Sequence, residues 1–278
     1  MDLRLTILCE NTAGKPAGII GEHGFACFLE RNEGAYLFDT GQGLGIAHNA
    51  QTLQTDLAAI RAVFLSHGHF DHTGGLVDVL RRTGPVDIYA HPDIFSERYW
   101  AGKYEERRNG IPYQRSKLEK LGARFRFREV FAEVAPGMYL SGEVPRRTSF
   151  EATDSHLVVP SREGNGFVPD PFRDDLSVAI DTVKGLVVVL GCAHAGLVNI
   201  LRHFLEKTGK NRIYAVVGGT HLAPAGEEQF DRTVKALREM GVERIGVSHC
   251  TGLPAAARLY DQFAGRFFFG TAGTVLEV

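Results

Sequence analysis

One short segment constrains this chain more than any other, because four side chains that bind metal ions lie within six positions. They are His67, His69, Asp71 and His72, and they follow the apolar run from Ala62 to Leu65, which predicts a buried strand. Imidazoles and a carboxylate suit zinc, iron or manganese. We expect His67 and His69 to face one ion, and Asp71 and His72 to face a second. A polar turn with incidental histidines is disfavoured, since burying charge without partners is costly.

Three further histidines follow apolar runs and lie beside small residues. They are His194, His221 and His249. A strand end with small neighbours leaves room for an ion or substrate to approach the backbone. We expect His194 and His249 to be the third ligands of the two ions, with His221 in reserve.

Two cysteines and one acidic pair are alternative ligands near these histidines. Cys192 and Cys250 each lie close to a histidine, and they are either ligands or small buried residues. Asp175, in the pair Asp174-Asp175, is either a metal-binding carboxylate or a turn residue.

The hydrophobic pattern predicts strands and helices that alternate in both halves of the chain. Expected strands are 3–9, 25–30, 35–38, 62–65, 86–90, 177–182, 185–190, 213–217 and 244–247, and expected helices are 74–82, 197–208 and 227–240, with one or two more between 47 and 60. The pair 177–182 and 185–190, separated by a glycine turn, is the strongest hairpin signal. The Gly- and Pro-containing stretch 161–171 is the expected flexible connection. The sequence therefore predicts an α/β protein.

The net charge and the composition limit the kinds of partner that we expect this protein to bind. With 31 basic and 33 acidic residues the net charge is -2, so a nucleic acid or an anionic membrane is not favoured as a partner. No apolar run is long enough to cross a bilayer, and we expect a cytoplasmic protein without a membrane partner. The four cysteines are too scattered for a disulfide framework. The pattern leaves the oligomeric state open.

Two basic segments are candidates for anion binding. Residues 98–128 carry ten basic residues against three acidic ones, with Tyr99, Trp100, Tyr104 and Tyr113 interleaved. We interpret this stretch as an insertion that covers the site and attracts a phosphorylated, ring-containing substrate; a solvated helical surface is the alternative. Arg146 and Arg147 form a second candidate anion clamp.

The motif His-x-His-x-Asp-His, followed by small residues, resembles the signature of the metallo-β-lactamase superfamily. The resemblance implies an αββα sandwich, here one domain over 1–278 with a basic insertion near 98–128. Asp39, in Phe38-Asp39-Thr40-Gly41, resembles the superfamily's first motif, whose aspartate supports the metal loop from behind its ligands. A plain turn residue is the alternative for Asp39.

A closer resemblance is to the subgroup named for dihydropterin-ribofuranosylaminobenzene phosphate synthase. The matching segments are spread over nearly the whole chain: 23–25, 38–41, 142–146, 174–177, 191–194 and 249–252. The usual bridging aspartate at a Gly-Asp strand end is missing, and Cys192 or His194 takes the equivalent place.

These features together predict a metal-dependent hydrolase that acts on a phosphate ester or related small anion. The cofactors would be two divalent transition-metal ions, with zinc favoured and iron or manganese open, and metal-activated hydroxide would be the nucleophile. Asp71 would be the catalytic residue that orients that hydroxide. One alternative is the condensation that the subgroup's name implies, with a phosphorylated pterin as substrate. The other is a low-turnover metal sensor or redox partner, which the two cysteines beside histidines favour.

Overall fold

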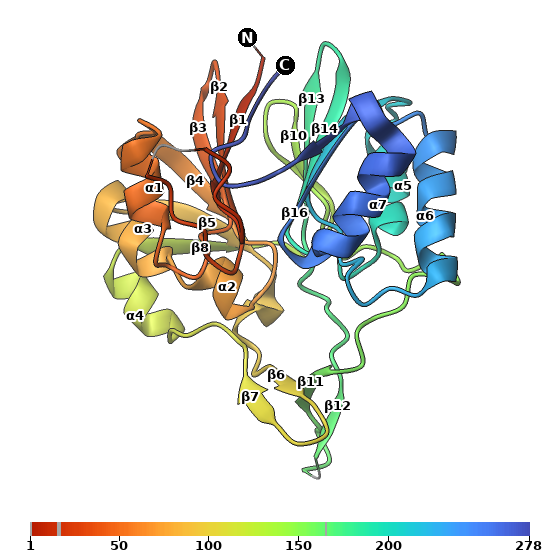
Figure 1. The fold of residues 1–278 in the computed structure, drawn as a ribbon. Coiled ribbons are helices and arrows are strands. Elements are labelled where there is room, and N and C mark those ends of the chain that lie inside the picture. Colours follow the sequence, from red (N-terminus) through yellow and green to blue (C-terminus); the bar gives the residue numbers. More distant parts are fainter. Residues whose placement is uncertain (1, 16–17, 165) are drawn as a thin grey trace.

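Two seven-stranded sheets pack face to face in the computed structural model, which describes residues 2–15, 18–164 and 166–278. The first sheet has the order β18-β1-β2-β3-β4-β5-β8 and the second β17-β16-β15-β14-β13-β10-β9. Helices cover the outer face of each sheet (Figure 1). This is the αββα sandwich that the sequence predicts.

The strands of the first sheet are β1 (Arg4–Cys9), β2 (Ala26–Arg31), β3 (Gly34–Phe38), β4 (Ile60–Phe64), β5 (Val86–Ala90), β8 (Ala123–Phe127) and β18 (Val275–Glu277). Those of the second sheet are β9 (Ala132–Ala135), β10 (Met138–Leu140), β13 (Val178–Thr182), β14 (Gly185–Leu190), β15 (Ile213–Gly219), β16 (Arg244–Ser248) and β17 (Phe267–Phe269). The α-helices are α1 (Ile46–Thr52), α2 (Phe70–Thr73), α3 (Leu76–Thr83), α4 (Arg115–Lys120), α5 (Leu197–Thr208), α6 (Glu227–Glu239) and α7 (Leu253–Phe263), and the 3-10 turns are η1 (Leu57–Ala59), η2 (Pro92–Phe95), η3 (His249–Thr251) and η4 (Ala264–Arg266).

Strand β14 shows how the sequence builds three apolar layers. Side chains alternate across a strand, so Val187 and Val189 join the core between the sheets. Leu186, Val188 and Leu190 point to the other face and pack in the core under α5, α6 and α7. A run that is apolar at every position is therefore buried on both faces, as in other helix-covered sheets.

A third, four-stranded sheet projects from the sandwich, and we call it the arm. Its order is β12-β11-β6-β7, from β6 (Tyr99–Ala101), β7 (Glu106–Arg108), β11 (Leu157–Pro160) and β12 (Phe167–Pro169). Figure 1 shows it hanging below both sheets, on the side where α2 lies. Two segments some fifty residues apart in sequence therefore share one small sheet.

The arm divides the basic stretch 98–128 into two parts. Only β6 and β7 belong to the arm, whereas α4 and β8 return to the first sheet, where β8 pairs with β5. The stretch 161–171 is not a plain connection, because β12 pairs with β11 across its turn. Asn165, within that turn, lies outside the described residues.

The helix expected over 74–82 begins at Leu76, two residues later than predicted, because a glycine pair precedes it. Gly74 and Gly75 separate α2 from α3, and a Cβ on Gly74 would lie 2.2 Å from the carbonyl oxygen of Gln42. Close packing against the loop that bears Gln42 therefore requires glycine here, and α2 and α3 remain separate helices. None of the helices described in the structure is long and apolar enough to cross a membrane.

Candidate metal centre

The candidate ligands meet because parallel strands end at the same edge of each sheet. In the first sheet β3 and β4 are parallel, and they lead into Asp39 and the loop that bears His67. In the second sheet β14, β15 and β16 are parallel and are followed by the segments bearing His194, His221 and His249. The two edges face each other, so both halves of the chain contribute side chains to one site.

One group of ligand atoms surrounds His67. Its Nε2 lies 2.9 Å from Nδ1 of His69. His67, Cys192 and His194 each offer a ligand atom, and these atoms lie within 4.8 Å of one another. Nε2 of His69 and Nε2 of His194 are buried and have no hydrogen-bond partner within the described part of the chain. Buried imidazole nitrogens without partners are what a metal ion would satisfy.

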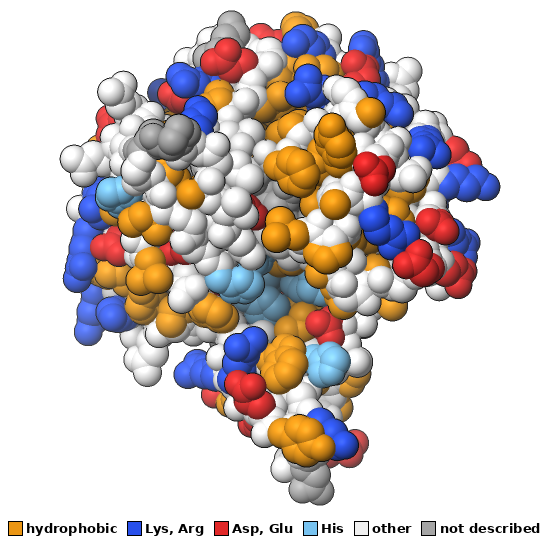
Figure 2. All heavy atoms as spheres, viewed as in Figure 1, with side chains coloured by type: hydrophobic (Ala, Val, Ile, Leu, Met, Phe, Trp, Pro, Cys, Tyr) orange, Lys and Arg blue, Asp and Glu red, His pale blue; other side chains and the backbone are white. Residues whose placement is uncertain are grey.

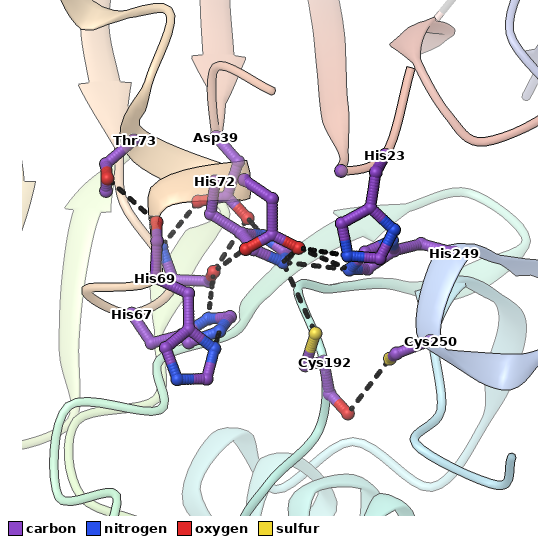
Figure 3. A network of polar contacts seen from close by, with 12 residues as sticks. His23, Asp39, His67, His69, His72, Thr73, Cys192, His249 and Cys250 are labelled. Atoms are coloured by element: carbon purple, nitrogen blue, oxygen red, sulfur yellow. Dashed lines mark hydrogen bonds and ion pairs between the residues drawn. The ribbon is translucent and has the colours of Figure 1, made fainter. Parts of the chain in front are cut away.

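A second group surrounds Asp71. Oδ2 of Asp71 lies 3.1 Å from Nε2 of His249, and Nε2 of His72 lies 3.3 Å from that same nitrogen. The thiol of Cys192 lies 3.3 Å from Nε2 of His72. Figure 3 shows Cys192 below the imidazoles of His72 and His249, on the side of Cys250. Cys192 therefore belongs to both groups of candidate ligand atoms.

Asp39 sets the orientation of two histidines. Its Oδ2 accepts hydrogen bonds from Ser66 Oγ at 2.6 Å and from His72 Nδ1 at 2.7 Å. Because the Ser66 hydroxyl donates to Asp39, it accepts from Nδ1 of His67 at 2.8 Å. Both imidazoles therefore carry a proton on Nδ1 and turn Nε2 toward the other candidate ligands, as a carboxylate behind a ligand histidine does in metal sites. The φ of Asp39 is 57°, a left-handed conformation that Asp tolerates better than most residues.

His249 is oriented from the opposite side. Its backbone N–H donates to Glu10 Oε1 at 2.7 Å, and its Nδ1 lies 2.9 Å from Asn11 Oδ1. These contacts direct Nε2 at Asp71. Left-handed backbone conformations at Ala193, His221 and His249 accompany the site, with φ of 55°, 51° and 50°. Such conformations cost energy and concentrate at functional sites.

The histidines of the site differ in the direction in which their pKa is shifted. Burial, together with the neighbouring imidazoles, lowers the pKa of His67 and of His194 well below the usual value. Burial lowers the pKa of His69 in the same way. These three are neutral at pH 7, the form in which imidazole binds a metal. Burial also lowers the pKa of His72, but the Asp39 and Asp71 carboxylates outweigh it and raise that pKa to about 9.

His23 is a site residue that the spacing of the candidate ligands did not indicate. Its Nε2 lies 3.2 Å from Oδ2 of Asp71, and its ring packs against His249 at 4.8 Å between centroids. The hydrogen bond to Asp71 raises the pKa of His23. Its position in the motif 23–25, which carried the family resemblance, was the available signal.

His221 lies at the far side of the His194 group. Its ring centroid is 4.5 Å from that of His194, and it offers a ligand atom to a third group with Cys192 and Cys250. Both of its ring nitrogens are buried without a hydrogen-bond partner among the residues that the structure describes.

The structure gives the remaining candidate residues different partners. Asp175 is in none of the ligand groups found among the described residues, and its Oδ2 accepts the backbone N–H of Ala195 at 2.7 Å. Arg146 donates to the backbone carbonyl of His194 at 2.5 Å, so it braces a ligand segment. Arg147 pairs with Glu206 at 2.6 Å on the surface. Neither arginine lines the cavity over the histidines, because local partners hold both guanidinium groups.

A cavity of about 520 Å³ lies over the ligand groups. His69, Asp71, Cys192, His194 and His249 line it from the sandwich side, and residues of the arm line the opposite side. Figure 2 shows the histidine side chains gathered in a hollow between the sandwich and the arm. A small molecule that enters this cavity would meet the imidazoles and carboxylate directly.

A buried ion-pair network connects the arm to the loop that bears His67 and His69. Arg98, immediately before β6, donates to Asp170 Oδ2 and to Asp174 Oδ1, each at 2.7 Å. Asp174 Oδ2 in turn accepts the backbone N–H of Gly68, between His67 and His69, at 2.8 Å. Both ends of the arm are therefore tied to the loop that carries the first ligands.

The fold and the site together define an α/β protein with two packed sheets, which places its candidate metal ligands where parallel strands end. The family model of the metallo-β-lactamase superfamily matches residues 20–249. The chain belongs to this superfamily, as its histidine motif predicts.

Individual relatives agree with this assignment. The chain is 32% identical to a 7,8-dihydropterin-6-methyl-4-(β-D-ribofuranosyl)-aminobenzene-5′-phosphate synthase of Methanocaldococcus jannaschii, over 99% of this chain and 97% of that protein. A solved structure described as a metal-dependent hydrolase of the β-lactamase superfamily is 30% identical and covers 99% of both chains with a TM-score of 0.85. The short form of human tRNase Z shares the fold, with a TM-score of 0.53, 14% identity and 99% of each chain covered. The predicted resemblance to the synthase subgroup is confirmed.

Proposed function

We propose that this protein is a metal-dependent hydrolase that acts on a phosphate ester or a related small anion. The observation that carries the proposal is the convergence of two ligand groups on one cavity, with Cys192 within reach of both. We assign His67, His69 and His194 to one ion and Asp71, His72 and His249 to the other. Divalent transition-metal ions, of which zinc best fits imidazole and thiolate ligands, supply an activated water and stabilise charge on a leaving oxygen.

The chemistry of the side chains of this protein fits that role. Burial keeps His67, His69 and His194 neutral, and Asp39 and Ser66 turn the Nε2 atoms of His67 and His72 toward the other ligands. His194 and His69 each have a buried nitrogen that lacks a partner within the described segments. A donor set so arranged is unsatisfied without a cation.

Asp71 orients the water, and His23 transfers a proton. Burial raises the pKa of Asp71, but the neighbouring imidazoles outweigh it and hold that pKa well below its usual value. The carboxylate is therefore ionised, and it can orient a water molecule and balance positive charge at the site. His23 contacts the same oxygen, is half-exposed at the cavity and has a raised pKa. We assign it the donation of a proton to the leaving group.

Metal content and turnover test the proposal together. Elemental analysis of the purified protein should give about two transition-metal ions per chain, with clear loss in His67→Ala and in His249→Ala. His48→Ala is the matched control, because His48 is exposed on α1 and binds the carbonyl of Gly18. The metal-loaded parent should hydrolyse bis(p-nitrophenyl) phosphate. Unchanged metal content in either variant removes that histidine from the site.

A second candidate function is the condensation named by the Methanocaldococcus jannaschii relative, which covers nearly the whole chain. There a carbon–nitrogen bond would form with loss of diphosphate, and the same ligand groups would bind the leaving diphosphate. Metal-loaded protein is incubated with a hydroxymethyl-dihydropterin diphosphate and a ribofuranosylaminobenzene phosphate, and products are read by mass spectrometry. Coupled product favours the synthase, and hydrolysis of the diphosphate alone favours the hydrolase.

A further inference from the structure

A further group of candidate ligands lies beside the two that we assign to divalent ions. It consists of Cys192, His221 and Cys250, and we call it the thiol cluster. Each residue offers one ligand atom, and these atoms lie within 4.8 Å of one another. All three residues line the cavity of about 520 Å³. A metal ion that enters the cavity therefore reaches two sulfur atoms and one imidazole nitrogen together.

The end of β15 leaves room for the two cysteines to approach each other. β15 lies between β14 and β16, which lead into the segments of Cys192 and Cys250. The last residue of β15 is Gly219, and a Cβ there would lie 2.6 Å from Sγ of Cys250 and 3.3 Å from Cα of Cys192. A larger residue would fill the space in which the Cys250 thiol lies. That thiol is directed at the Cys192 segment, with Sγ 3.6 Å from the carbonyl oxygen of Cys192 (Figure 3).

His221 adds an imidazole whose nitrogens the protein does not use. Both ring nitrogens are buried, and neither has a hydrogen-bond partner in the part of the chain that the structure describes. A metal ion bound to one of them would satisfy it. Two buried threonines connect the segments of His221 and Cys250. Thr251 Oγ1 accepts the backbone N–H of Thr220 at 3.1 Å, and the two hydroxyl oxygens lie 2.9 Å apart. These contacts position both ligand segments before an ion binds.

The ligand types and the neighbouring charges favour a soft ion of low charge. Thiolates and imidazole suit Cu(I) and zinc better than the hard ions that prefer oxygen. Cys192 also belongs to both ligand groups that we assign to divalent ions. A third divalent ion here would lie close to two others and be repelled. A monovalent ion with two thiolates keeps a net negative charge, which two divalent ions attract.

We propose that the thiol cluster binds one soft monovalent metal ion, Cu(I), through Sγ of Cys192, Sγ of Cys250 and one ring nitrogen of His221. The two thiols release their protons to solvent as the ion binds. Copper keeps its oxidation state, so the step consumes no oxidant or reductant. This inference goes beyond the proposed function, because Cys250 and His221 are in neither set of assigned ligands and no substrate is involved.

Copper binding to the zinc-loaded and the metal-free protein tests this site. Cu(I) is added in the absence of oxygen with ascorbate present, so that copper and thiols both stay reduced. Bicinchoninate competes for the ion as a coloured Cu(I) chelator and reports the affinity. Elemental analysis of the zinc-loaded parent should give about one copper ion per chain, with the divalent ions retained. X-ray absorption at the copper edge should show sulfur and nitrogen neighbours.

Two variants and two matched controls identify the ligands. Cys250→Ser and His221→Ala should each weaken Cu(I) binding by at least about a hundredfold, since even an outer partner of a ligand contributes about 10- to 100-fold. Both variants should keep their divalent ions. Cys27→Ala is the control for the thiol, because Cys27 is fully buried in the core between the sheets. His48→Ala, exposed on α1, is the control for the imidazole. Both controls should bind copper as the parent does.

Three results would overturn the proposal. The first is a parent that binds no Cu(I) in competition with bicinchoninate, and the second is equal binding by the parent and both variants. The third is release of one divalent ion for each copper ion bound, which would place copper in the assigned ligand groups. Copper binding by a protein that takes up no divalent ions supports the thiol cluster and rejects the hydrolase. Turnover of bis(p-nitrophenyl) phosphate without copper binding supports the hydrolase and rejects the thiol cluster.

Discussion

Replacing Arg98 by methionine should destabilise the protein strongly. The guanidinium makes two buried contacts of 2.7 Å, to Asp170 and Asp174, and a weaker one of 3.3 Å to the carbonyl of Asp93. Methionine keeps much of the apolar stem but leaves two carboxylates without their cation. Removing one partner of a buried ion pair costs about 3–5 kcal/mol, which corresponds to a fall in Tm of roughly 6 to 20 °C for a chain of this size.

The free energy of unfolding lost in Arg98→Met should depend on pH in a defined direction. Burial raises the pKa of Asp174 to about 6 even beside Arg98, above its value in the unfolded chain. Without the guanidinium the pKa rises further, so protonation relieves the cost. The free energy of unfolding lost in Arg98→Met should therefore be smaller at pH 5 than at pH 8, and it should grow as pH rises through about 6 and above.

Urea unfolding followed by circular dichroism at the two pH values measures both effects. Arg108→Met, exposed on the same arm, should leave the free energy of unfolding within about 0.5 kcal/mol of the parent. A loss below about 1 kcal/mol in Arg98→Met, or a larger loss at pH 5 than at pH 8, would refute the reasoning.

Three further predictions concern the ligand support and the core. Asp39→Asn should weaken metal affinity about 10- to 100-fold, measured by competition with a chelator; unchanged affinity would contradict the role of Asp39. His203 is buried, and its Nε2 lies 2.9 Å from the carbonyl oxygen of Ser141. Burial lowers the pKa of His203. The unfolded chain therefore binds a proton at this histidine before the folded chain does, and the free energy of unfolding falls as pH drops below about 6.5. His203→Gln should flatten the loss of stability between pH 7 and pH 5 in urea titrations, and an unchanged slope would reject this. Phe204→Ala should cost about 3–5 kcal/mol of unfolding free energy, because Phe204 is fully buried under the second sheet. Val183→Ala, at an exposed turn, is its control and should cost little.

Much of the sandwich could be predicted because its signals are local. The hairpin over 177–182 and 185–190 forms as β13 and β14, and the helix over 197–208 has the predicted bounds. Both predictions depend only on the spacing of apolar residues and glycines within about a dozen positions. The helix predicted over 74–82 was wrong at its start. Gly74 packs against the backbone of Gln42, and this contact between distant residues cannot be seen in the local sequence pattern.

The arm could not be predicted, since β6 pairs with β11 across more than fifty residues. For the same reason the sequence did not distinguish buried from exposed arginines in the basic stretch 98–128. In the structure Arg98 is buried and Arg107 is exposed. The histidines that converge on the site were visible as strand-end residues. The sequence left open whether Cys192 or His194 lies between the two groups, because that depends on how the two sheets face each other.

The division of the proposed ligands between the two sheets has a thermodynamic consequence. His67, His69, Asp71 and His72 follow a strand of the first sheet, and His194 and His249 follow strands of the second. A cation that needs both sets has affinity for the assembled sandwich and little for either half alone. By linkage, its binding free energy adds to the packing of one sheet on the other. Chelation should thus loosen the interface between the sheets before it unravels either one.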